Sequence, residues 1–142
     1  MVKRYANLSL IYALLALAFG VFYREFTKYN HFEGRTALSV IHPHYFVLGM
    51  VFFLVLMLLE KSFGFSGGKR VSLFLILYQV GLNVSVLGFL LRGLTDVWQT
   101  ALSSGMDASI SGLSGLGHTV LGVSLVLLLL QIRKSAVRGT NP

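Results

Sequence analysis

Four long apolar stretches, separated by short polar segments, dominate the pattern of hydrophobic and polar positions along the chain. A helix needs about 20 apolar residues, at 1.5 Å each, to cross a hydrocarbon core of roughly 30 Å. Four stretches meet this requirement: residues 6–23, 37–59, 71–91 and 110–132. The pattern therefore predicts an all-α protein of one domain, an integral membrane four-helix bundle with up-down topology that spans residues 1–142.

The first stretch also has features of a secretory signal peptide. Lys3 and Arg4 precede it, and Ala16-Leu17-Ala18 resembles a cleavage site. The apolar run continues past this point to Tyr23, which favours a membrane span.

Composition agrees with a lipid environment. The chain is 55% hydrophobic and only 12% charged, with a mean hydropathy of +0.75, whereas a globular protein is about 25% charged. The net charge of +7 does not indicate nucleic acid, because the basic residues form small groups between apolar runs, as in Lys69-Arg70 and Arg133-Lys134. The absence of cysteine excludes disulfides, iron–sulfur clusters, thiolate metal sites and c-type haem attachment.

The basic residues also predict the direction of the spans. If the N-terminus is cytoplasmic, the inner side carries eight Lys and Arg residues: Lys3, Arg4, Lys61, Lys69, Arg70, Arg133, Lys134 and Arg138. The outer side then carries four: Arg24, Lys28, Arg35 and Arg92. Positively charged loops stay inside, so both termini are expected in the cytoplasm. The longest loops, residues 24–36 and 92–109, are then outside, and either is able to fold a short helix over the outer mouth of the bundle.

Three histidines lie within the predicted spans, where an ionisable side chain is costly and indicates function. His44 lies 16 residues before Glu60, and His118 lies 15 residues before Arg133, which places them about 24 and 22 Å from the inner boundary. In an up-down bundle the second and fourth helices stand diagonally across the core. Two imidazoles at one depth on these helices are able to ligate one metal ion between them.

The remaining histidines receive other roles. His42 and His44 point about 200° apart on a helix, so only one of them is expected to be the ligand. Depth favours His44, and His42 is expected nearer the outer boundary, facing water or the polar edge of a cofactor. Pro43 between them favours a helix start. His31 lies in the first outer loop and is interpreted as a solvated surface residue.

Small and polar residues surround the predicted histidine level. Ser111, Gly115, His118 and Gly122 share one helix face, and the glycines leave room either for a flat macrocycle or for close helix packing. Asn83 is about 20 Å from Arg70, close to the same level. It is expected to support the ligands by a hydrogen bond, with interhelical hydrogen bonding as the alternative.

A b-type haem fits two apposed imidazoles in an apolar core without thiolates. The haem propionates need cations at the outer level, and Arg24, Arg35 and Arg92 are candidates, with interfacial anchoring as their alternative role. Two other interpretations stay open. One is a copper or zinc centre that adds Met106, Asp107 or Met50 as a third ligand to the histidines. The other is an accessory or assembly subunit without a cofactor, whose histidines relay protons or change conformation.

Residues 38–61, LSVIHPHYFVLGMVFFLVLMLLEK, together with GVFYREFTK before them and GLGHTVLG after them, resemble a family of short four-span bacterial membrane proteins of unknown function. This resemblance covers nearly the whole chain and implies the bacterial cytoplasmic membrane. The pattern of His42, His44, Gly49 and Met50 also resembles haem-ligating helices of the haem-copper oxidase and nitric oxide reductase superfamily, which implies haem at His42 or His44. The chain lacks the further helices and the copper-binding histidines of that superfamily, so its catalytic activity is not carried over.

The expected role is therefore electron transfer, haem handling or gas sensing, and the sequence indicates no catalysed reaction. A quinone or a redox protein is the expected partner, beside the lipid bilayer. Gly81 and Gly88 lie seven residues apart on one helix face, which favours a homo-oligomer.

Overall fold

The computed structural model describes residues 1–138, and its regular structure consists of helices. α1 comprises Val2–Tyr29, α4 comprises Lys69–Val97 and α5 comprises Ser104–Arg138. Between α1 and α4, a composite helix covers Ala37–Phe63 and is called the second span below. Each of these four helices is long and apolar enough to cross a membrane, as the four apolar stretches predict.

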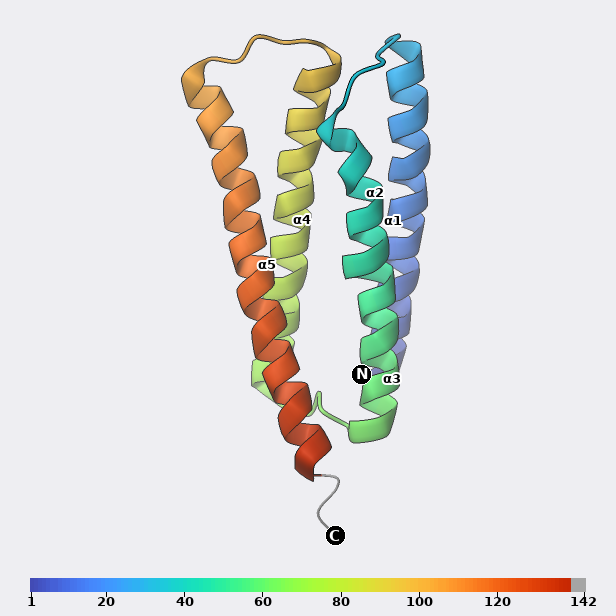
Figure 1. Cartoon of the computed structure of the whole chain (residues 1–142). Coiled ribbons are helices and arrows are strands. Elements are labelled where there is room, and N and C mark those ends of the chain that lie inside the picture. Colours follow the sequence, from blue (N-terminus) through green and yellow to red (C-terminus); the bar gives the residue numbers. More distant parts are fainter. Residues whose placement is uncertain (139–142) are drawn as a thin grey trace.

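Consecutive helices run in opposite directions, so the start of α1 and the end of α5 lie at one end of the molecule, called the terminal end here (Figure 1). The loops 30–36 and 98–103 lie at the other end, called the far end. The prediction of long loops at the far end is wrong. Residues 24–29 continue α1, residues 92–97 continue α4, and residues 104–109 begin α5. A continued helix keeps its backbone groups hydrogen-bonded in a way that an open loop does not.

Glycine determines how closely α4 and α5 pack. A Cβ added to Gly81 would lie 2.5 Å from the backbone nitrogen of Leu121, and one added to Gly117 would lie 2.5 Å from that of Ser85. A Cβ added to Gly88 would meet the side chain and the Cα of Ser114. Small residues allow two helix backbones to approach, which increases their dispersion contacts. Gly81 and Gly88 therefore belong to a contact within the chain, and their spacing gives no argument for an interface between copies.

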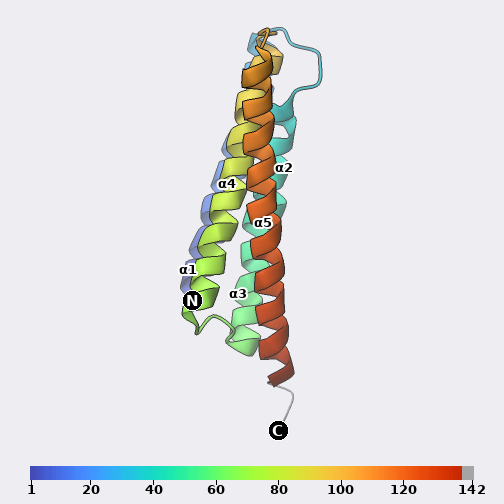
Figure 2. The same ribbon diagram turned by 90° about the vertical axis from the view of Figure 1, so that its left-hand side faces the viewer.

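α1 packs along the second span in a similar way. A Cβ on Gly49 would lie 2.6 Å from the Cβ of Tyr12, so glycine is needed where the two helices cross. The second span also contacts α4 near its start and α5 near its end, and Figure 2 shows it beside α5. The second span and α5 are thus neighbours, whereas the sequence predicted them diagonally across the core. The close glycine contacts join the helices as two pairs, α1 with the second span and α4 with α5, and the second span also contacts both helices of the other pair.

The second span changes its helical geometry along its length. It starts as a 3₁₀ turn at Ala37–Val40, continues as α2 at Ile41–His44, widens to a π-helix at Tyr45–Val51 and ends as α3 at Phe52–Phe63. In this wide region the backbone oxygens of Leu48 and Met50 accept hydrogen bonds from Tyr78 (2.8 Å) and Ser9 (3.0 Å). Neighbouring helices therefore stabilise the unusual turn, as backbone groups in an apolar environment require.

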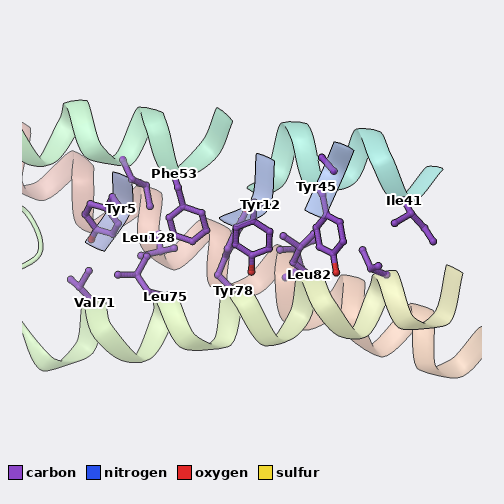
Figure 3. Packing of buried hydrophobic residues seen from close by; sticks show 14 of the residues in the cluster. Tyr5, Tyr12, Ile41, Tyr45, Phe53, Val71, Leu75, Tyr78, Leu82 and Leu128 are labelled. Carbon is purple, nitrogen blue, oxygen red and sulfur yellow. The ribbon is translucent and has the colours of Figure 1, made fainter. Parts of the chain in front are cut away.

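Aromatic rings fill the interior between the helix pairs. Tyr12 stacks on Phe53 with ring centroids 5.6 Å apart. Tyr5 contacts Phe53 at one end of this pair, and Tyr45 contacts Tyr12 at the other. Figure 3 shows this row of buried rings, with the hydroxyl groups of Tyr12 and Tyr45 directed toward α4. The core thus consists of large apolar surfaces, with polar atoms placed where a partner on a neighbouring helix can reach them.

Candidate functional site

His44 of α2 and His118 of α5 lie side by side near the far end. Their ring centroids are 6.0 Å apart, and the ring planes are almost perpendicular, at 87°. Phe89 of α4 contacts both rings, at 4.8 Å from His44 and 5.4 Å from His118. The common level that the spacing predicted is therefore present in the structure, and three helices contribute to the group.

Hydrogen bonds to the backbone determine which nitrogen of each ring is available. The Nδ1 atom of His44 lies 2.7 Å from the oxygen of Val40, and that of His118 lies 2.8 Å from the oxygen of Ser114. A carbonyl oxygen only accepts, so Nδ1 must carry the proton in each ring. In the neutral imidazole, Nε2 then holds a free lone pair, which is the state that ligates metals.

His42 faces a different helix. Its Nδ1 donates to the oxygen of Ala16 at 2.8 Å, and a Cβ on Gly20 would lie 2.9 Å from the same nitrogen. The ring also contacts Phe46 edge to face, at 4.7 Å. His42 therefore packs against α1, while His44 contacts α5, and the two histidines diverge as their spacing predicts. Leu17, Val21 and Arg24 line a shallow groove beside His42.

The glycines of α5 divide into two groups. Gly117 packs tightly on α4, but a Cβ on Gly115 or Gly122 would meet nothing within 4 Å. His118, between these two open positions, is exposed, and His44 is half-buried. The histidine pair is thus accessible from the outer face of α5, where no side chain of residues 1–138 lies close to these two glycines.

Asn83 does not contact the histidines, contrary to the supporting role expected for it. Its Oδ1 accepts a bond from Tyr45 at 3.0 Å, and its Nδ2 donates to Tyr12 at 3.1 Å and to the oxygen of Gln79 at 2.7 Å. These bonds join α1, the second span and α4. The alternative role, interhelical hydrogen bonding, is the one that the structure shows.

The arginines near the site differ in their partners. Arg92 donates to Asp107 at 2.6 Å and to Ser111 at 3.0 Å, two turns from His118 on the same face of α5. Arg24 is exposed and lies 3.8 Å from Glu25. Asp107 is therefore paired with Arg92, and within residues 1–138 no three His, Asp or Glu side chains gather as a metal-binding group.

Two features of the site escape the hydrophobic pattern. Phe89 belongs to an apolar run in which its contact with histidines has no distinct sequence signal. The π-helix that follows His44 is visible only from burial in the structure, where Ile41, Tyr45, Gly49 and Phe53 are buried at intervals of four residues. Such a period exceeds the 3.6 residues of an α-helix and indicates a wider turn.

The fold defines a class: proteins of four antiparallel helices, each long and apolar enough to span a membrane. Within this class, residues 2–135 match the DUF2871 family, described as proteins of unknown function. The chain belongs to this family, since the match covers nearly its whole length. Comparison with curated proteins and with solved structures finds no match.

Proposed function

We propose that the protein is a multi-pass protein of the bacterial cytoplasmic membrane that binds one b-type haem between His44 and His118. The observation that carries the proposal is the pair of imidazoles with free Nε2 atoms, 6.0 Å apart between ring centroids, on two neighbouring helices. Metal–imidazole bonds are about 2.0–2.1 Å long. Two imidazoles that bound one metal ion would therefore hold their nitrogens at most about 4 Å apart, with the ring centroids somewhat farther.

The residues around the histidine pair support the proposal, because they offer an aromatic wall and an open helix face for a macrocycle. Phe89 offers an aromatic wall against both rings. Gly115 and Gly122 leave the outer face of α5 open on either side of His118. Arg92 of α4 donates to Ser111, which lies two turns from His118 on α5, and in this proposal its guanidinium pairs with a propionate in addition to Asp107. Arg24 and His42 lie together on the α1 side and belong to a separate groove in this proposal.

Ligation by two histidines favours electron transfer. With His44 and His118 both bound to its iron, a haem held here would have no free position for a gas ligand and would supply one-electron redox chemistry. The open face of α5 allows an apolar electron carrier to approach from the lipid, so a membrane quinone is the proposed partner. A homo-oligomer that covers this face in part remains compatible with the same chemistry.

The charge distribution supports an orientation with both termini in the cytoplasm. The chain has no cysteine, so single cysteines report the sides directly. Thr100→Cys, in the loop at the far end, should react with an impermeant maleimide added to intact cells. Gly67→Cys, in the exposed turn at the terminal end, should react only after the membrane is opened. Labelling in the reverse order would overturn the orientation.

The haem proposal is tested by a reduced-minus-oxidised absorption spectrum of the purified protein. The wild type should show the bands of bis-histidine haem, and His44→Ala and His118→Ala should each lose them. His31→Ala, in an exposed loop, is the matched control and should retain the bands. His42→Ala should retain them too, because His42 packs against α1. Full haem retention in both His44→Ala and His118→Ala would refute the ligand assignment.

The two other interpretations give different results in the same preparation. A colourless protein with stoichiometric copper or zinc would support the mononuclear metal site. A colourless protein with neither metal would support the accessory subunit without a cofactor.

A further inference from the structure

The charges of the protein are distributed unevenly between its two ends. At the far end, Arg24, Lys28, Arg35 and Arg92 are balanced by Glu25, Glu33, Asp96 and Asp107. At the terminal end, eight Lys and Arg residues face a single carboxylate, Glu60. The carboxylate of Glu60 accepts a bond from the backbone nitrogen of Ser66. The whole net charge of +7 therefore lies at the terminal end.

Five of these eight cations gather where α4 begins and α5 ends. Lys69, Arg70, Lys134 and Arg138 line one groove of about 480 Å³ between the two helices. Arg133, Lys134 and Arg138 line a second groove on the adjoining face of α5. All five side chains are exposed, and neither ion pair found among residues 1–138 involves them. Like charges so close together favour an anion between them.

An apolar path leads from these grooves along α5. Leu130 lines the second groove, and it shares a helix face with Val126 and Val123. These three side chains are 45%, 55% and 57% exposed. The cations thus lie at the boundary of the apolar helix segments, and an exposed apolar strip runs from them along α5 toward the far end. A ligand that matches both parts has a charged phosphate and a hydrocarbon chain.

We propose that the two grooves, formed by the start of α4 and the end of α5, bind the phosphate headgroup of an anionic phospholipid whose acyl chain lies along Leu130, Val126 and Val123. Basic pockets between transmembrane helices bind anionic headgroups by this combination of charge and depth. Lys134 and Arg138 line both grooves and are the central residues of the site. The site is far from the histidine pair and does not depend on haem.

The test is a lipid titration of the full chain in dodecyl maltoside, followed by native mass spectrometry. Wild-type protein should bind phosphatidylglycerol and leave phosphatidylcholine unbound. Each cation near an anionic headgroup strengthens binding about fivefold, so Lys134→Gln/Arg138→Gln should weaken phosphatidylglycerol binding about 25-fold. The charge-conserving variant Lys134→Arg/Arg138→Lys should retain most of the binding. Circular dichroism checks that each variant keeps its helices.

Lys3→Gln/Arg4→Gln is the matched control, because it removes two charges from the same end but from α1. It should bind phosphatidylglycerol within about threefold of wild type. An equal loss in both double variants would overturn the proposal in favour of a diffuse field. Equal binding of phosphatidylcholine and phosphatidylglycerol would overturn it as well. Displacement of the lipid by millimolar inorganic phosphate would instead identify a site for a free anion.

Discussion

The contact between α4 and α5 predicts opposite effects for two glycines that lie on the same two packed helices. In Gly81→Ala, the new Cβ would lie 2.5 Å from the nitrogen and 2.8 Å from the Cα of Leu121. Ordinary contacts of carbon are about 3.5–4.0 Å, so the two helix backbones must separate by about 1 Å. Overpacking of this kind costs about 1–3 kcal/mol. In Gly115→Ala, the new methyl meets nothing within 4 Å, and alanine stabilises a helix interior by roughly 0.5–1 kcal/mol relative to glycine.

The two variants should therefore differ by about 1.5–4 kcal/mol in the free energy of unfolding. The measurement is reversible unfolding in dodecyl maltoside by added dodecyl sulfate, followed by circular dichroism. Gly122→Ala is a second control, because its position is equally open. If Gly115→Ala destabilises as much as Gly81→Ala, the division of the α5 glycines into packed and open positions is wrong.

Three further substitutions test single polar contacts by the same unfolding measurement. Tyr78→Phe removes the bond to the oxygen of Leu48 in the wide turn, and should cost about 0.6 kcal/mol, the average for hydrogen bonds between membrane helices, and at most about 1.7 kcal/mol; no loss would contradict a stabilising role for this bond. Thr36→Val removes the cap of the second span and the bond to the oxygen of Gly93, and should cost about 1 kcal/mol; a neutral result would contradict the capping role. Arg92→Gln should cost less than about 1 kcal/mol, because its ion pair is partly exposed, and a large loss would place that pair in a structural role.

The hydrophobic pattern predicts the four helices because the length of an apolar run is sufficient to identify a span. It does not predict which face of a span is buried, since lipid and protein interior are equally apolar. Gly115 and Gly117 illustrate this limit: two residues apart in one helix, the first is open and the second touches the backbone of α4. Polar residues are more informative, yet Asn83 was assigned to the histidines on depth alone, which leaves its direction around the helix open.

The histidine pair was more predictable than its surroundings. Depth along a regular helix is proportional to residue number, so His44 and His118 could be placed at one level from their distances to Glu60 and Arg133. The order of the helices around the bundle depends instead on which surfaces fit together. That fit rests on Gly49, Gly81 and Gly117, whose neighbours become known only from the structure.

The wide turn at Tyr45–Val51 sets the direction in which His44 points relative to the buried residues in the rest of the second span. Each residue of an α-helix rotates the chain by about 100°, and a π turn accommodates one residue more than an α turn. If the same residues formed an ordinary α-helix while Phe53 and Leu56 kept their places in the core, the extra residue would rotate His44 by roughly 100° away from His118. The direction of the imidazole thus depends on the wide turn, and a change that straightens this turn without removing a residue would separate the two histidines while the helices stay packed.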